Sequence, residues 1–265
     1  MTTIYWLRND LRLHDNECLQ KAISIAQPLL IVYCYDPRQF EILPLNFRKT
    51  GYLRFKFLCE SIKNLRESCI EKEGNLLIHV GKPEEILPQL VEQHKANHLI
   101  YQKEIASEEL AVENNLAETL KNTSCTITPI WGKTLYHPDD APFPPEKTPL
   151  TSKAFRINLT KNTAVRPLIE TPKKLPASPK LQDWGDIPTA IDLGFNKSEI
   201  QHPTSQDYIG GETFGLRRLQ DYTFETQQLT SYRWTRNRSL GMEYSSKFSP
   251  WMALGALSPR QIYWT

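Results

Sequence analysis

The first 135 residues of this chain alternate between two hydrophobic periods, and this alternation constrains the fold more than any other feature. Short apolar or β-branched runs recur with few polar residues, which is typical of strands buried on both faces of a parallel sheet. Segments with helical spacing of apolar residues separate them. The pattern predicts a doubly wound α/β fold with a five-stranded parallel sheet. The expected strands are Thr3–Leu7, Leu29–Tyr35, Leu76–Val80, Leu99–Tyr101 and Thr126–Trp131.

Four helices are expected between these strands. Asp15 and Asn16 are suited to capping the first helix, and Pro83 is suited to the first turn of the third. Neither a GxGxxG motif after the first strand nor a GxxxxGK[ST] motif is present, so a Rossmann fingerprint and a P-loop are not indicated. The expected helices are Asp15–Ala26, Phe47–Ile70, Glu84–Lys95 and Ser107–Leu120.

A proline-rich stretch follows the predicted α/β domain. Ten of the 19 prolines lie between Pro138 and Pro188, and proline removes backbone donors that regular elements need. We expect a long linker with one short helix near Ser152–Leu159, followed by a helical region. The expected division is an α/β domain over residues 1–135, a linker over 136–205 and a helical part over 206–265.

The net charge of +2 conceals an asymmetry. Residues 1–150 carry 17 Lys/Arg against 20 Asp/Glu, whereas residues 151–265 carry 15 against 10. A polyanionic partner is therefore expected at the second half. The alternative is that these extra charges are an ordinary solvated surface.

Composition and short motifs exclude several classes of protein. No apolar run is long enough to span a bilayer, and charges at Arg8 and Asp10 are unlike a secretory signal. The five cysteines include no CxxC pair, so neither a disulfide framework nor a zinc ribbon is indicated. The histidines form no metal-ligand pattern, because His94 and His98 are expected on different elements. We expect a monomeric cytoplasmic protein without a metal site.

A hydroxyl-rich segment precedes one of the last predicted helices. Three serine hydroxyls and one lysine ammonium fall within the five residues from Ser245 to Ser249. Ser249-Pro250 is a typical N-cap with proline at the first helical position, as is Ser258-Pro259. Free amides at a helix N-terminus, together with hydroxyls and an ammonium, form a cradle for a phosphate or diphosphate. The alternative is a serine-rich cap beside a solvated lysine.

The string YSSKFSPWMALGALSPR in this segment resembles the flavin-phosphate motif of the photolyase/cryptochrome family in its cryptochrome-DASH form. The N-terminal string WLRNDLRLHDN resembles the first strand and turn of that family. The remaining matches occur in the expected order at Val32–Pro37, Asp183–Asp186, Gly210–Gly215 and Tyr232–Asn237.

The resemblance implies a Rossmann-like N-terminal domain, a long linker and the beginning of an all-α FAD-binding domain. The helix predicted from Pro259 has fewer than two turns before Thr265, so we expect a chain interrupted within that domain. By resemblance, Arg236 lies near DNA, although an internal ion pair is its alternative role. The implied FAD contacts are Tyr232, Ser245, Ser246, Lys247, Phe248 and Ser249.

The resemblance also implies an antenna chromophore, 5,10-methenyltetrahydrofolate in the DASH branch, at the carboxyl ends of the strands. A carboxylate can accept two hydrogen bonds from the amino-pyrimidine edge of a pterin. Glu108 is the preferred carboxylate and Glu104 is its rival. Acidic residues in a first helical turn are also ordinary partners of the helix dipole.

The implied activity is that of a deoxyribodipyrimidine photo-lyase, in which light-driven electron transfer from reduced FAD splits cyclobutane pyrimidine dimers, preferably in single-stranded DNA. No catalytic residue of that reaction is expected in this chain, which we expect to be inactive alone. Two alternatives remain. One is a blue-light photoreceptor without substantial repair, and the other is an α/β module that binds an antenna chromophore. Longer downstream sequence would test the module, and repair assays would separate the other two.

Overall fold

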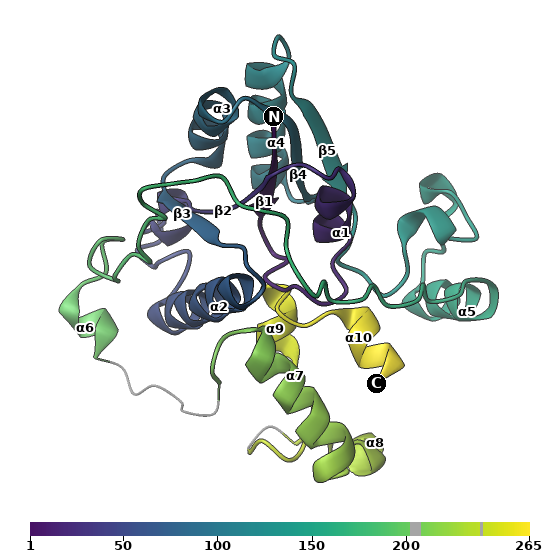
Figure 1. Cartoon of the computed structure of the whole chain (residues 1–265). Coiled ribbons are helices and arrows are strands. Elements are labelled where there is room, and N and C mark those ends of the chain that lie inside the picture. The colour runs from purple at the N-terminus through teal and green to yellow at the C-terminus, as the bar shows by residue number, and fades with distance from the viewer. Residues whose placement is uncertain (202–207, 239–240) are drawn as a thin grey trace.

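A computed structural model describes residues 1–201, 208–238 and 241–265. Its centre is one five-stranded sheet in the order β3-β2-β1-β4-β5, and every pairing is parallel (Figure 1). The predicted doubly wound α/β fold is therefore confirmed. The strands are β1 (Thr2–Leu7), β2 (Leu29–Tyr35), β3 (Leu76–Val80), β4 (Ala96–Gln102) and β5 (Thr126–Ile130).

Helices cover both faces of this sheet, and each face has its own hydrophobic core. Along β1, Tyr5 and Leu7 enter one core whereas Ile4 and Trp6 enter the other, because successive strand residues point to opposite faces. This two-sided burial explains why the strands read as nearly continuous apolar runs. The covering helices are α1 (Glu17–Ser24), α2 (Tyr52–Glu71), α3 (Pro83–Gln93) and α4 (Ser107–Leu120).

The ends of these helices follow local capping chemistry. Asn16 caps α1, since its side-chain oxygen accepts a hydrogen bond from the Leu19 amide at 2.9 Å. The start predicted for the second helix at Phe47 is wrong. The chain there forms a loop with an isolated bridge between Ile42 and Arg48, and α2 begins only after Gly51.

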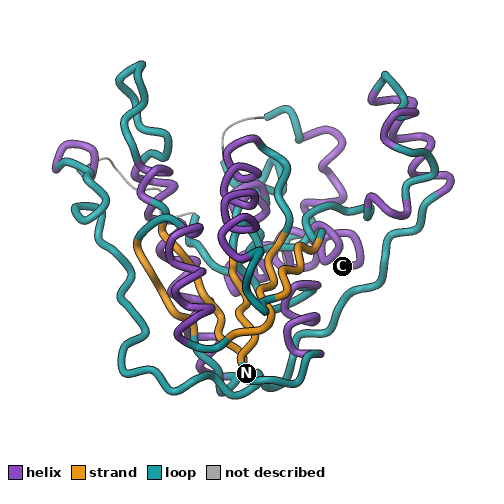
Figure 2. Tube along the Cα trace, turned by 90° about the horizontal axis from the view of Figure 1, so that it is seen from above, coloured by secondary structure: helices purple, strands orange, loops and turns teal. Residues whose placement is uncertain are grey.

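The proline-rich region is extended, apart from two short 3-10 turns, η2 (Pro138–Asp140) and η3 (Pro145–Lys147), α5 (Ser152–Asn162) and α6 (Lys197–Ile200). Figure 2 shows this loop running along the sheet, close to the N-terminus. Backbone hydrogen bonds hold it there, including one from the Leu29 amide to the Ala177 carbonyl at 3.0 Å. The expected boundary between residues 205 and 206 lies outside the described residues.

Short helices make up the described part of the chain after residue 208. The first of these helices ends at Gln220 and continues as a π-helical turn. Ser258 caps its helix as predicted, accepting from the Arg260 and Gln261 amides. The elements are α7 (Glu212–Gln220), η4 (Asp221–Glu225), η5 (Gln228–Ser231), α8 (Tyr232–Thr235), α9 (Ser249–Ala253) and α10 (Pro259–Trp264).

A buried polar loop after β1 joins the helical region to the sheet. The guanidinium of Arg12 is almost fully buried and donates to the carbonyls of Asp15, Gly132 and Gly255. Glu212, at the start of α7, accepts from the amides of Leu13 and His14 at 2.9 and 2.8 Å. These contacts satisfy polar groups that would otherwise be costly to bury.

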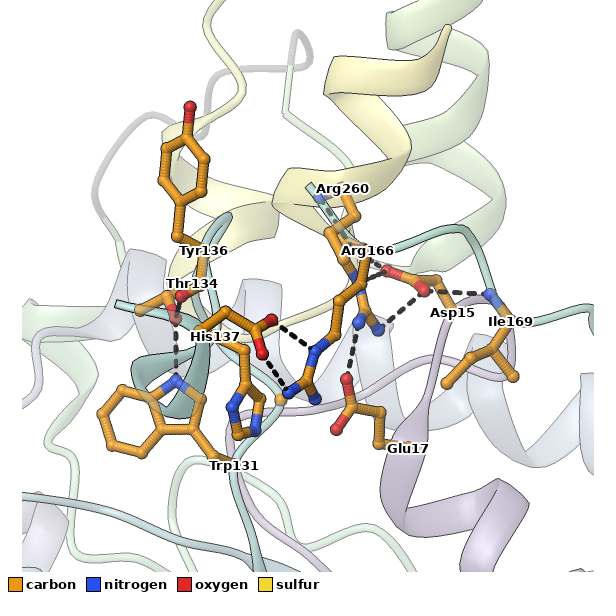
Figure 3. Close-up of polar contacts among 12 residues, drawn as sticks. Asp15, Glu17, Trp131, Thr134, Tyr136, His137, Arg166, Ile169 and Arg260 are labelled. Atoms are coloured by element: carbon orange, nitrogen blue, oxygen red, sulfur yellow. Dashed lines mark hydrogen bonds and ion pairs between the residues drawn. The ribbon is translucent and has the colours of Figure 1, made fainter. Parts of the chain in front are cut away.

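A second set of contacts connects the same loop to α10 and to the extended region. Asp15 accepts from the Ile169 amide at 3.1 Å and pairs with Arg260, whose guanidinium also contacts Glu17 at 2.5 Å (Figure 3). Residues from two distant segments thus converge on the Asp15 carboxylate. The WLRNDLRLHDN string therefore serves as the docking surface between the sheet and the C-terminal helices.

Candidate cofactor and nucleic-acid sites

The hydroxyl-rich loop lies immediately before α9. Lys247 has a left-handed φ of 56°, and the following Phe248 is right-handed with φ −72° and ψ −16°. Consecutive residues of opposite hand turn their amides toward a common point, which is a backbone arrangement that binds anions. Ser245 and Ser246 are half-buried beside it. The loop therefore combines backbone and hydroxyl donors, as a phosphate cradle requires.

The predicted capping role of Ser249 is wrong. Phe248 is the N-cap of α9, and Ser249 is the first helical residue, with an exposed side chain. The reason is that Phe248 already has helical φ and ψ angles, so the helix starts one residue earlier than the N-cap motif indicated. The Ser249 hydroxyl therefore does not cap the helix, and it is accessible to a ligand.

Arg218, on α7, holds the loop from behind. Its guanidinium donates to the carbonyls of Met242, Ser245 and Ser246 at 2.6, 3.2 and 3.1 Å. It also pairs with Asp221 at 2.8 Å. Three carbonyls of the loop are thereby committed to one cation. The role of Arg218 could not be predicted from the sequence, where its only local signal is Asp221, three positions later at the start of η4.

Aromatic packing anchors the helix that follows the loop. Trp251 is 2% exposed, packs against the ring of Phe57 from α2, and donates from Nε1 to the Ile209 carbonyl at 3.0 Å. Gly215 of α7 lies against it, since a Cβ there would sit 3.0 Å from the tryptophan ring. Trp251 therefore anchors the C-terminal end of the loop, and the hydrogen bonds of Arg218 hold its N-terminal end.

An unpaired polar atom lies beside this loop. Among the described residues the buried hydroxyl of Tyr222 has no hydrogen-bond partner, although its ring packs edge-on against Phe248. Burial, and secondarily the proximity of Tyr232, raise the pKa of Tyr222. A buried hydroxyl without a partner next to convergent amides fits a site that a polar ligand completes.

Tyr232 and Arg236 lie on α8 and the turn after it. Tyr232 is 39% exposed, and the Arg236 side chain is exposed to solvent. Tyr232 lies close enough to Tyr222 to contribute to its raised pKa, and therefore lies near the loop. Five of the six predicted FAD residues are consecutive in the chain, and the structure places Tyr232 near them on a separate element.

A cavity of about 490 Å³ lies at the carboxyl ends of β1 and β2 and the start of α4. Such a position, beside the point where the strand order reverses, is where doubly wound sheets bind ligands. Glu108 lines this cavity and forms an ion pair with Lys49. Its carboxylate is 61% exposed at the side chain, so it is available to a ligand.

Glu104 has a different environment. It is 7% exposed, accepts from Asn9 Nδ2 at 3.2 Å, and forms an ion pair with Lys133. It is absent from the residues that line the cavity. Its carboxylate oxygens are therefore used inside the protein, and of the two rival carboxylates Glu108 is the one positioned to contact a ligand in the cavity.

Other site classes find no support in the described parts of the chain. Within residues 1–201, 208–238 and 241–265, His, Cys, Asp and Glu side chains form no group of three suited to a metal ion. His94 ends α3 and His98 lies in β4. No helix in these ranges is long and apolar enough to cross a membrane. His202 lies outside the described residues.

Comparison with known proteins places these features in a family. The family model for DNA photolyase matches residues 3–178. Cryptochrome DASH of Gloeobacter violaceus is 42% identical over 262 residues, covering 99% of this chain and 52% of the relative. Cryptochrome DASH of Synechocystis is 42% identical over 264 residues, covering 99% and 53%.

Solved structures agree with this match. The crystal structure of the Synechocystis cryptochrome superposes with a TM-score of 0.92 at 40% identity, and the match covers 99% of this chain and 54% of that one. The chain therefore spans about half the length of the curated relatives it matches.

Proposed function

This chain belongs to the DNA photolyase family, in its cryptochrome-DASH branch, and on that premise we propose that it supplies the antenna domain and the phosphate-binding loop of a light-driven flavoprotein. The observation that carries the proposal is the loop from Ser245 to Ser249. Its left-handed turn at Lys247 and its hydroxyls form a donor set for a diphosphate.

Within that site the residues have separate roles. The amides after Lys247 and the hydroxyls of Ser245, Ser246 and Ser249 would donate to the FAD phosphates, and the ammonium would offset their charge. Phe248 is buried against Tyr222 and fixes the turn. Tyr232 would donate from the neighbouring helix. When bound and reduced, FAD supplies the photoexcited electron that splits a cyclobutane pyrimidine dimer.

The proposed substrate is DNA containing such dimers, preferably single-stranded, because moving a damaged base out of a strand costs less when it is unpaired. Arg236 is the proposed phosphate contact, since an exposed guanidinium presents a planar donor fork to a phosphate. The excess of basic residues in the second half of the chain supports this placement.

The proposed antenna is 5,10-methenyltetrahydrofolate in the cavity lined by Glu108. The cavity volume of about 490 Å³ is in the range that small-molecule sites occupy. The carboxylate of Glu108, which pairs with Lys49, would accept from the amino-pyrimidine edge of the pterin. This part of the proposal is independent of the flavin loop.

We expect the 265-residue chain alone to bind FAD weakly and to lack repair activity, because Tyr232 and Ser249 beside the loop remain open to solvent. The test is an absorbance and fluorescence scan of the purified chain, which reports flavin and pterin separately. Stoichiometric flavin after gel filtration would contradict the expectation of weak binding.

Repair is tested on a chimera that joins this chain to the C-terminal half of the Synechocystis relative. Under blue light it should split thymine dimers in a single-stranded oligonucleotide faster than in the matching duplex, with a dark sample as the control. A chimera that binds FAD but repairs neither substrate would contradict the repair function and favour the photoreceptor alternative.

A further inference from the structure

The surface of α8 combines an exposed aromatic ring with arginines that form no ion pair among the described residues. Trp234 is 74% exposed, which is unusual for so large an apolar side chain. The sequence from Thr226 to Met242 contains three arginines and no acidic residue. A ring presented to solvent among cations is the combination that single-stranded nucleic acid binding requires.

The spacing of these residues puts them within reach of one strand. Arg233 and Asn237, four residues apart, lie on the exposed side of α8 and its following turn, and the Arg233 and Arg236 side chains are both exposed. The opposite side of the helix faces the protein, since Ser231 and Thr235 are partly buried. Arg233 and Arg236 therefore lie on the solvent side of the same short segment that carries the exposed ring.

Close to Trp234 in the sequence, an arginine is stacked on a tyrosine ring. Arg238 is one helical turn beyond Trp234, and its guanidinium lies over the ring of Tyr244 at 5.1 Å from the centroid. Arginine and aromatic planes both accept a nucleobase on a free face. The surface thus offers successive planar groups with charges at their edges.

We propose that Trp234 is a stacking platform for an unpaired nucleobase, and that Arg233, Arg236 and Arg238 hold the flanking phosphates of the same single strand. The proposal rests on the proposed function only for the class of its partner, nucleic acid. It adds a contact made to bases, whereas Arg236 alone would contact the backbone. A duplex cannot use the ring in this way, because its bases are already stacked on one another.

The test measures binding of the full chain, in the dark and without flavin, to fluorescein-labelled dT16 by fluorescence anisotropy. Stacking contributes about 1–3 kcal/mol per base, so Trp234→Ala should weaken dT16 binding about tenfold. Trp234→Phe should recover most of the loss. Leu150→Ala removes a fully exposed apolar side chain on the remote η3–α5 segment and should leave binding unchanged.

Two further ligands identify what the ring contacts. An abasic 16-mer with the same backbone should bind the parent and Trp234→Ala equally, because it has phosphates but no bases. A 16-base-pair duplex should likewise show less than about a twofold difference. Equal binding of dT16 to parent and Trp234→Ala, or an equal loss on the abasic strand and the duplex, would overturn the proposal. The binding measurement uses an undamaged strand and no light. A failure of the chimera to repair dimers would therefore not affect the result of this test.

Discussion

The guanidinium of Arg12 donates to the carbonyl of Gly255 at 2.9 Å, across 243 positions of sequence. At that point the chain packs so closely that a Cβ on Gly255 would lie 1.9 Å from the Asn9 carbonyl oxygen, and Gly255 has a left-handed φ of 65°. The loop after the first strand and the end of α9 therefore form one interlocked contact. The position of the phosphate-binding loop depends on it.

Replacing Arg12 by lysine should destabilise the protein. A lysine ammonium cannot reach the Asp15, Gly132 and Gly255 carbonyls together, so buried acceptors lose their partners. We expect a free energy of unfolding lower by about 2–4 kcal/mol. Urea denaturation measures it, with exposed Arg236→Lys as the control. An unchanged midpoint for Arg12→Lys would contradict the role given to this contact.

Glu212→Gln should remove a pH-dependent part of the stability. Burial alone raises the pKa of Glu212, but the hydrogen bond and charge of His14 and the amides of Leu13 and His14 more than offset it, and the pKa is lowered. The difference in free energy of unfolding between the wild-type protein and the variant should be full above pH 4.5, the ordinary pKa of a glutamate. It should disappear as the pH falls through the lowered pKa of Glu212.

At pH 7 the Glu212→Gln variant should lose about 2–4 kcal/mol, because the glutamine amide nitrogen cannot accept a hydrogen bond. Denaturant unfolding at pH 7 and pH 3 measures the convergence of the two proteins. Exposed Glu118→Gln is the control and should show neither effect. A stability difference that stays constant with pH would mean that the carboxylate charge is not what stabilises the interface.

Arg218→Gln should loosen the phosphate-binding loop. Glutamine cannot donate to all three carbonyls that Arg218 serves, so the amides of residues 245–247 should exchange with deuterium about tenfold faster. The neighbouring Arg217, which is exposed, provides the matched control as Arg217→Gln. Equal exchange in the two variants would show that the loop holds its shape without the guanidinium.

Lys247→Ala should weaken FAD binding in the chimera by about 1.5–3 kcal/mol, the scale of a charge-assisted hydrogen bond. Alanine and lysine have a similar energetic cost at the left-handed φ of 56°, so the substitution removes the side chain without adding backbone strain. Equilibrium dialysis against FAD measures the affinity. If it is unchanged, Lys247 is not a ligand of the phosphates.

Glu108→Gln and Glu104→Gln should separate a ligand contact from a structural one. The first should weaken methenyltetrahydrofolate binding by about 1.5–3 kcal/mol without changing the thermal midpoint. The second should lower the midpoint with little effect on folate, because Glu104 is buried against Lys133 and Asn9. The reverse pattern would assign the antenna carboxylate to Glu104.

Much of the fold could be predicted from the sequence because its signals are local. Hydrophobic periodicity within a few residues indicated all five strands, and the chemistry of Asn16 and Pro83 marked where helices begin. Errors occurred where local signals compete. The helix expected from Phe47 starts at Tyr52, and the N-cap expected at Ser249 lies at Phe248.

The candidate site likewise has parts that could be predicted from the sequence and parts that could not. The hydroxyl-rich segment was visible because its donors are consecutive in the chain, so their proximity needs no folding. The sequence could not reveal Arg218 as the residue that shapes this segment, since its partners lie more than 20 positions away. The resemblance favoured Glu108 over Glu104, but the sequence could not show which of the two lines the cavity, because they differ in what surrounds them and not in type.

By itself, then, the sequence determined the alternation of strands and helices, the family resemblance and the hydroxyl-rich segment proposed to bind a diphosphate, because each depends on residues close together along the chain. Only the tertiary structure decided that the WLRNDLRLHDN loop is an interface, that Arg218 holds the phosphate loop, and that Glu108 lines the cavity. The physical reason is that burial and hydrogen-bond partners are set by packing between segments up to 245 residues apart.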